Sequence, residues 1–314
     1  MAIDSMKLIR HLDNLRDEKP ITADIFLTNY CNNNCPYCTY HRWELEPGSR
    51  YMKFEDFVRY VTKMRALGVK GVILTGGGEP TINPDFEGIT RWLESSGIKY
   101  GLNTNFNKYV ECSPSFLKVS LDGYSEKSYK RRRGVDAYNK VVENIHKYCE
   151  FRDKSQTSLG VQIVVTNFDE IDLFYDSTKD LDVDFIVFRP IEATGGYYTQ
   201  NDIAGVVQSM MNAINRLKLK DNRVVLNSKW YQLSTCFGKC SAQWAQLAID
   251  ERGNVMYCCQ KPYEIVGHIM DNDILDKKRA FKTDMSKCDI PCRMTASNII
   301  ADYLVKPMKD GEFI

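Results

Sequence analysis

Eleven cysteines are the residues of this 314-residue chain whose type and spacing most directly suggest chemistry. Nine of them form two groups, one near the N-terminus and one in the last third, while Cys112 and Cys149 stand apart. The odd number excludes complete pairing in disulfides, and the polar first 20 residues lack the apolar stretch of a secretory signal. Because disulfides are rare in a reducing compartment, the grouped cysteines predict metal ligands in a cytoplasmic protein. Cys112 and Cys149 are expected to be small buried side chains.

The first group consists of Cys31, Cys35 and Cys38 in the sequence TNYCNNNCPYC. Three thiolates on one turn-prone loop can converge on one metal centre. Structural zinc usually takes four protein ligands, and His41 would complete such a set. Three cysteines on an iron–sulfur cluster would instead leave one iron open to another ligand. The spacing alone leaves both interpretations open.

The elements that must position this loop alternate between strand and helix. We predict six strands at 23–28, 71–75, 99–103, 116–121, 160–166 and 184–188. Helical periodicity covers 55–67, 85–94, 138–151, the segment from 169, and 203–217. Apolar strands that alternate with amphipathic helices indicate a parallel sheet buried on both faces. The predicted fold class is therefore α/β, a partial (β/α)6 TIM barrel, with a doubly wound open sheet as the alternative and functional residues at the carboxyl ends of the strands.

The order of motifs after these strands resembles that of the radical S-adenosylmethionine (radical SAM) enzymes. In that family a CxxxCxxC loop, here Cys31, Cys35 and Cys38, holds a 4Fe–4S cluster whose open iron binds SAM. The family's GGE motif follows the second strand in the sequence GGGEP. The resemblance implies SAM contacts from Tyr37, Gly77, Gly78, Glu79, Asn103, Ser120, Arg133 and Arg189. Taken one by one, the polar and glycine-rich segments also suit ordinary turns.

Residues 130–133, KRRR, raise the question of nucleic-acid binding. Lys and Arg total 42 against 41 Asp and Glu, a balance that argues against a surface built to bind nucleic acid. We therefore expect a solvated helix face, in which Arg133 pairs with the SAM carboxylate if the resemblance holds. No apolar run reaches the roughly 18 residues of a membrane span.

The second group contains Cys236, Cys240, Cys258, Cys259, Cys288 and Cys292. Cys240 and Cys258 flank a predicted hairpin that turns at Gly253. This spacing resembles the start of the twitch and SPASM extensions of radical SAM enzymes, which carry auxiliary iron–sulfur clusters. The resemblance implies one auxiliary 4Fe–4S cluster, for which we predict the ligands Cys236, Cys240, Cys258 and Cys292, with Cys288 as the nearest substitute. A structural zinc site is the alternative.

These observations predict three regions: an N-terminal helical extension (1–20), a radical SAM barrel (21–219) and a small C-terminal α+β iron–sulfur subdomain of twitch or SPASM type (220–314). The resemblance implies reductive cleavage of SAM to a 5′-deoxyadenosyl radical that abstracts hydrogen from a substrate carbon. We expect oxidation or rearrangement of a small molecule such as a sugar, aminocyclitol or nucleotide derivative, and a reducing partner such as flavodoxin or ferredoxin. Peptide modification and a non-catalytic zinc-binding interaction protein are the alternatives.

Overall fold

One curved sheet organises the computed structural model, which describes residues 10–38, 40, 50–194, 202–231, 238–290, 292 and 294–305. The sheet has ten strands in the order β11-β10-β9-β1-β2-β3-β4-β5-β6-β8. Their bounds are Thr22–Phe26 (β1), Gly71–Thr75 (β2), Tyr100–Thr104 (β3), Phe116–Ser120 (β4), Ser158–Val165 (β5), Phe185–Pro190 (β6), Val224–Leu226 (β8), Gln246–Ile249 (β9), Asn254–Met256 (β10) and Ile265–His268 (β11). The predicted His41 and Cys236 lie outside the described residues.

The six predicted strands are confirmed, each to within two residues at either end. β1 through β6 pair in parallel in sequence order, which is the open, partial barrel that the alternation predicted. Most residues of β5 are buried, whereas β2 and β4 alternate between buried and partly buried residues. Helices cover the outer face of the sheet. β8 also joins this parallel sheet beside β6, although it lies beyond residue 219.

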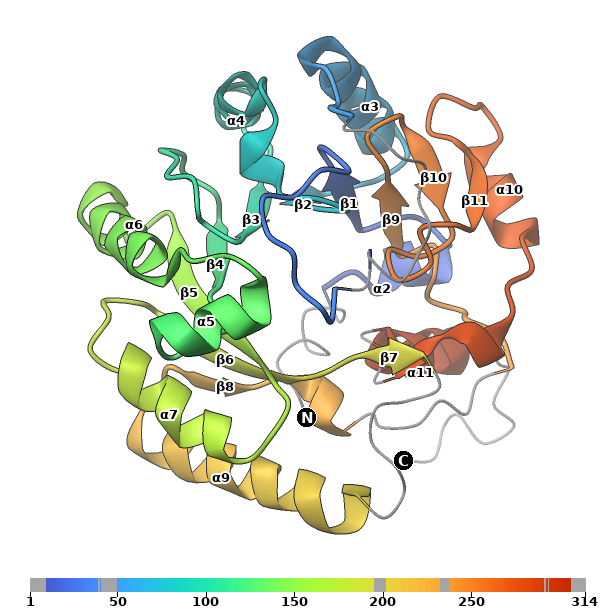
Figure 1. The fold of residues 1–314 in the computed structure, drawn as a ribbon. Helices are drawn as coiled ribbons and strands as arrows, with labels where there is room; N and C mark the ends of the chain where they lie inside the picture. The colour runs from blue at the N-terminus through green and yellow to red at the C-terminus, as the bar shows by residue number, and fades with distance from the viewer. Residues whose placement is uncertain are drawn as a thin grey trace.

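The helices form a layer outside the curved sheet (Figure 1). They are α3 (Phe54–Ala66), α4 (Phe86–Ser95), α5 (Glu126–Arg133), α6 (Tyr138–Phe151), α7 (Asp169–Thr178) and α9 (Gln208–Lys220), the last preceded by the π-helical turn η3 (Ile203–Val207). Each long helix buries one apolar stripe, such as Phe57, Val61 and Met64 in α3. None of the described helices combines the length and the apolar character that crossing a bilayer requires.

Helix α5 corrects the expectation for the KRRR segment. A capping box of Ser125 and Ser128 starts the helix, and Gly134, at φ 70°, ends it. Arg131 is exposed, but Arg132 and Arg133 are buried. The segment is therefore not a solvated face, because its last two side chains turn toward the barrel and form ion pairs there.

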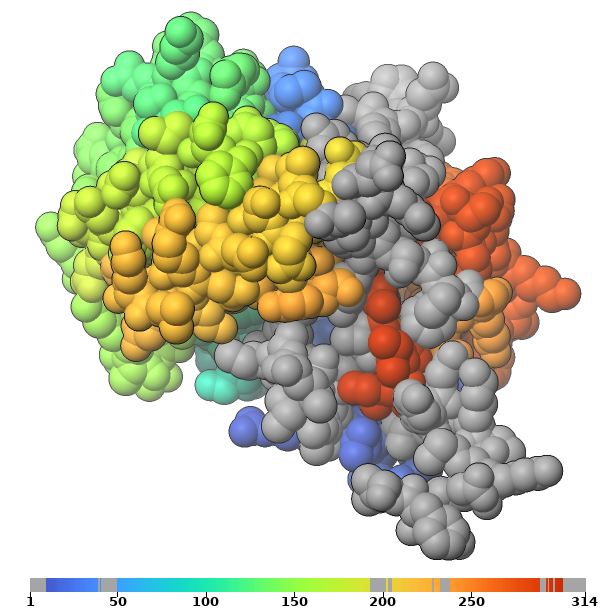
Figure 2. Space-filling view, turned by 90° about the horizontal axis from the view of Figure 1, so that it is seen from below, coloured from blue at the N-terminus to red at the C-terminus, as the bar shows by residue number. Residues whose placement is uncertain are grey.

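The C-terminal region continues the sheet. β9 pairs in parallel with β1, with Gln246 opposite Thr22, and the β10–β11 hairpin extends that edge. Helix α10 (Ile274–Ala280) packs against β11, and the short strand β12 (Asp289–Ile290) pairs with β7 (Ala193–Thr194). Helix α11 (Thr295–Val305) contacts α2 (Leu12–Arg16), and Figure 2 shows the red C-terminal segment on the same face as blue N-terminal residues. The two ends of the described chain thus close the base of the barrel together.

Candidate active site

The cysteine loop, residues 29–38, follows β1 and is held by the segments after three other elements. Backbone amides after β2 donate to the carbonyls of Thr28 (2.9 Å) and Tyr30 (2.8 Å). Asn105, after β3, donates its side-chain amide to Asn32 (2.7 Å), and the last residue of α5 accepts a hydrogen bond from the Asn34 amide (2.9 Å). The carboxyl ends of the strands therefore fix the loop, as the parallel barrel requires.

The three thiols of this loop lie near enough to interact, with Cys35 buried and Cys31 and Cys38 half-buried. Burial raises the pKa of Cys31 to about 12, and the thiols of Cys35 and Cys38 add to that rise. Burial also raises the pKa of Cys35, which the guanidinium of Arg133 opposes, with its Nη1 3.1 Å from the Cys35 sulfur. Metal ligation would displace these protons, because thiolate is the ligating form.

Arg133, predicted to pair with a SAM carboxylate, is held by protein groups. Besides its contact with Cys35, it donates to the Ser120 carbonyl and lies 3.4 Å from the carboxylate of Asp122. Asp122 has a φ of 48°, in the left-handed region that few residues other than glycine adopt. The residues at the end of β4 thus bind the Arg133 guanidinium, which also contacts the Cys35 thiol of the cysteine loop.

The two glycines of the GGE motif meet different surroundings. A Cβ atom added at Gly78 would lie 1.8 Å from the carbonyl oxygen of Tyr30, so only glycine allows the segment this close to the cysteine loop. At Gly77 the nearest atom would be a ring carbon of Phe26 at 3.5 Å, which is an ordinary contact.

The carboxylate of Glu79 is fully occupied by the protein. It accepts hydrogen bonds from the Thr81 amide (3.1 Å) and hydroxyl (2.7 Å), the Thr104 hydroxyl (2.6 Å) and the Asn105 amide (2.7 Å). Burial raises its pKa, and the four donors oppose that rise. Glu79 therefore ties the segment after β2 to the end of β3.

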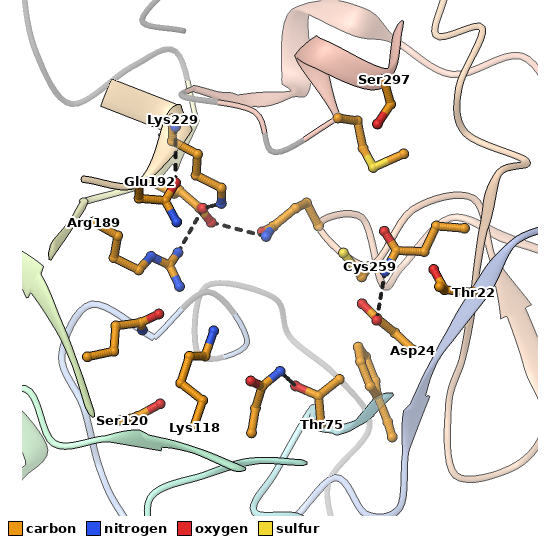
Figure 3. Close-up of a pocket in the computed structure, with 18 of the residues that line it drawn as sticks. Thr22, Asp24, Thr75, Lys118, Ser120, Arg189, Glu192, Lys229, Cys259 and Ser297 are labelled. Atoms are coloured by element: carbon orange, nitrogen blue, oxygen red, sulfur yellow. Dashed lines mark hydrogen bonds and ion pairs between the residues drawn. The ribbon is translucent and has the colours of Figure 1, made fainter. Parts of the chain in front are cut away.

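A polar cavity of about 640 Å³ lies inside the barrel and is lined in part by the ends of β2, β3 and β4. Asn103, Ser120 and Arg189 line it, so three of the predicted cofactor residues share one cavity. Figure 3 shows Lys118 extending into the cavity from β4 and Asp24 from β1.

Tyr37 and Asn103 carry buried polar atoms that suit a ligand. The Tyr37 hydroxyl and the Asn103 carbonyl oxygen have no hydrogen-bond partner among the residues that the structure describes. The Arg132 guanidinium lies 5.4 Å from the centre of the Tyr37 ring. Buried polar atoms normally find partners, so a polar ligand beside the cysteine loop would complete them.

An ion-pair network forms one wall of the cavity. Arg189 pairs with Glu192 (2.7 Å), which also pairs with Lys229 and accepts a hydrogen bond from Gln260 (3.0 Å). On the opposite wall the Gln246 amide donates to Asp24 (2.7 Å). The cavity thus has two cations paired with Glu192 on one side and the carboxylate of Asp24 on the other.

A second, smaller cavity of about 40 Å³ brings the C-terminal cysteines together. Cys240, Cys258, Cys288 and Cys292 all line it, and burial raises the pKa of Cys240 to about 12. Three of these are predicted ligands, and Cys288 is the substitute. The adjacent Cys259 lines the barrel cavity instead.

The two cysteine sets can be compared with the donor sets of metal centres. Among the described residues no three Cys, His, Asp or Glu side chains are arranged to hold one metal ion. A four-iron cluster is larger than one ion, so its thiolates stand further apart than the ligands of a zinc site. Three thiols on the first loop and four around the second cavity fit the donor sets of two such clusters.

Sequence reasoning missed the residues that complete these sites. The Glu192–Lys229 pair and the buried Lys278 beside the second cavity carry no motif. A signal was present for Glu192, which follows Arg189 by three residues at the end of a predicted strand. Nothing local marks Lys278, which reads as one of three basic residues on an amphipathic helix.

Comparison with known proteins agrees with this geometry. Residues 25–172 match the Radical SAM superfamily. A probable GTP 3',8-cyclase of Pyrococcus abyssi is 36% identical over 137 residues, which cover 41% of this chain and 44% of that protein. The molybdenum cofactor biosynthesis protein moc-5 of Caenorhabditis elegans is 31% identical over 202 residues, 60% of this chain and 33% of that protein. The chain therefore matches less than half the length of these relatives.

Two solved structures share the fold across most of the chain. Native anSMEcpe with bound AdoMet gives a TM-score of 0.63 at 19% identity and covers 86% of this chain and 83% of that one. Streptococcus suis SuiB bound to precursor peptide SuiA gives 0.62 at 16% identity, covering 90% and 73%. At these identities the likeness concerns the fold, the partial barrel.

Proposed function

We propose that this chain, whose residues 25–172 form a radical SAM domain, is an enzyme that reductively cleaves SAM beside the cysteine loop and oxidises or rearranges a small molecule in the barrel cavity. One observation carries the proposal: the ends of β2, β3 and β4, which hold the loop of Cys31, Cys35 and Cys38, also line a polar cavity of about 640 Å³. Ser120 links the two, since its carbonyl accepts from the arginine that contacts Cys35 and the residue itself lines the cavity.

The cysteine loop would hold a 4Fe–4S cluster through its three thiolates and leave one iron open for SAM. When bound, the cluster and SAM supply a 5′-deoxyadenosyl radical that abstracts hydrogen from a substrate carbon. The protein's own part is to bind, to orient and to keep water away from the reacting carbon.

Individual side chains divide these tasks. We assign direct contacts with SAM to Tyr37, Asn103 and Ser120 and to the backbone of Gly77 and Gly78. Glu79 acts by holding that backbone in place, because its carboxylate already accepts four hydrogen bonds.

The two predicted arginines differ in role. Arg133 sits against Cys35 and reaches the SAM carboxylate only by leaving part of that contact. Arg189 belongs to the ion-pair wall with Glu192, which places it on the substrate side of the cavity.

The cavity favours a small, polar, anionic substrate. Lys118, Arg189 and Lys229 line it, and relatives named GTP 3',8-cyclase act, by their name, on a nucleotide. A nucleotide derivative is therefore our first choice, and rearrangement is preferred over dehydrogenation. Peptide modification is the second candidate, because a solved structure with the same fold has a precursor peptide bound.

The C-terminal region would hold an auxiliary cluster of twitch or SPASM type. Its cavity and the barrel cavity share Gln260 and Met294 in their walls, so the two sites adjoin. An auxiliary cluster there would lie close enough to the substrate to bind it or to accept an electron. A flavodoxin or ferredoxin would supply the reducing electron in the cytoplasm.

Anaerobic reconstitution tests the proposal. We expect about eight irons per chain and formation of 5′-deoxyadenosine from SAM and dithionite. Cys35→Ala should abolish that product, whereas Cys112→Ala, at a buried position remote from the loop, should not. Fully iron-loaded protein that forms no 5′-deoxyadenosine would contradict a radical mechanism.

The substrate class needs a second measurement. SAM cleavage is followed after addition of the low-molecular-mass fraction or the peptide fraction of a cell extract. Stimulation by the first supports a small molecule, and stimulation by the peptide fraction alone would support the alternative.

A further inference from the structure

A lysine without exposed surface lies behind the second cysteine cavity. Lys278, on α10, donates from Nζ to the carbonyl oxygens of Met256 (3.1 Å) and Tyr257 (2.6 Å). The ammonium also lies 5.5 Å from the centre of the Tyr257 ring. These contacts hold a positive charge at the end of β10, directly before Cys258.

Lys278 differs from every other buried cation in the described part of the chain. These others are Arg132, Arg133, Arg152, Lys229 and Lys261, and they pair with Glu170, Asp122, Asp184, Glu192 and Glu264 in that order. No described carboxylate pairs with Lys278, whose partners are carbonyl oxygens and a ring. A buried ammonium without an anion is costly by several kcal/mol, so the fold must supply a negative charge or bear that cost.

The groups near Lys278 that can become negative are thiols. Negative charge on Cys258, Cys240 or Cys259 favours the charged form of Lys278 and raises its pKa. Cys258 and Cys240 also line the small cavity, together with Cys288 and Cys292. Four thiolates around a metal centre carry negative charge in excess of the metal's, whether the centre is a cluster or zinc. Lys278 would neutralise part of that excess from the buried side.

We propose that Lys278 is the built-in counter-charge of an anionic metal–thiolate group held by Cys240, Cys258, Cys288 and Cys292. The proposal rests on the auxiliary cluster of the proposed function and sharpens it in two ways. It names Cys288, which lines the cavity, as a ligand. It also assigns a residue that tunes the group, since charge and hydrogen bonding around the sulfurs set the reduction potential of such clusters.

The opposite signs expected in metal-free and metal-loaded protein make the test sharp. In metal-free protein, Lys278→Met removes an uncompensated buried charge, so its melting temperature should equal or exceed that of the wild type. In iron-loaded protein, the same variant should melt lower than the wild type and either lose the second set of irons or show a more negative midpoint potential in an EPR redox titration. Lys278→Arg keeps the charge and should restore the potential.

Lys277→Met is the matched control, because it removes the same charge from the neighbouring, exposed position, where the lysine pairs with Asp271 and Asp273. We expect it to leave iron content and potential at wild-type values. If Lys278→Met destabilises metal-free and loaded protein equally and changes neither iron content nor potential, Lys278 is only structural and the proposal fails.

Iron counts separate this failure from that of the proposed function. Wild-type protein with about four irons and normal SAM cleavage would remove the auxiliary cluster itself, and Lys278 would lose its role with it. The proposed set also predicts that Cys288→Ala loses the second set of irons. Their retention in that variant, together with their loss in Cys236→Ala, would overturn the assignment of Cys288.

Discussion

Replacement of Glu79 by glutamine tests whether this carboxylate holds the protein or holds the cofactor. Oε1 accepts three of its four hydrogen bonds, and Oε2 accepts the one from the Asn105 amide. Glutamine has the same shape but only one oxygen, so its amide nitrogen must face at least one donor. Because an unsatisfied buried donor costs about 1–3 kcal/mol, Glu79→Gln should lower the free energy of unfolding by about 2 kcal/mol.

That loss should appear before any cofactor is present. For a chain of this size it corresponds to a fall of about 3 °C in the melting temperature of the metal-free protein. Glu87→Gln makes the same chemical change on α4, where the carboxylate is 77% exposed, and should shift stability by less than about 0.5 kcal/mol. Thermal unfolding of the metal-free variants and equilibrium dialysis with SAM of the loaded ones supply the two readouts.

The refuting result is a separation of these readouts. Suppose that Glu79→Gln and Glu87→Gln have the same melting temperature in the metal-free state, but only Glu79→Gln binds SAM more weakly. The carboxylate would then contact the cofactor, and its four hydrogen bonds would not be its main role.

Two further comparisons probe the surroundings of the loop. Gly78→Ala would place its methyl carbon 1.8 Å from a backbone oxygen of the cysteine loop, so this variant should lose cluster iron on reconstitution. Gly77→Ala, whose nearest contact would be 3.5 Å, should retain the iron. Equal iron content in the two variants would contradict the argument. Arg132→Met leaves Glu170 buried without its cation and should lower the free energy of unfolding by about 3–5 kcal/mol in urea denaturation, against less than about 0.5 kcal/mol for the exposed Arg131→Met. Matching urea midpoints for the two arginine variants would show that the buried pair contributes nothing.

The strands and helices of the barrel were predictable because their signal is local. The apolar run GVILT predicts the strand β2, although only Val72 and Leu74 of it are fully buried. Helix α6 begins and ends where its periodicity does. The order of polar residues after the strands follows from the same alternation. Sequence alone therefore predicted that Asn103, Ser120 and Arg189 face one space, since parallel strands bring their carboxyl ends together.

Contacts between distant segments were not predictable in this way. The pairing of β9 with β1 joins residues more than 200 positions apart, and neither strand's sequence indicates its partner. The burial of Arg132 and Arg133 depends on Glu170 and Asp122, which lie on other elements. A run of basic residues predicts an exposed surface unless the acidic residues that pair with it are known.

The same limit explains why the second cysteine set needed the fold. Spacing restricts Cys240 and Cys258 to one hairpin, but Cys288 and Cys292 arrive from beyond α10, and only their position around one cavity selects them. That cavity shares Gln260 with the barrel cavity, and Gln260 donates to Glu192, the acid that also pairs with Arg189. The second cavity therefore lies one hydrogen bond away from the ion-pair wall of the barrel cavity. Under the proposed function, an auxiliary cluster at the second cavity would therefore change the charge beside Arg189 through Gln260 and Glu192.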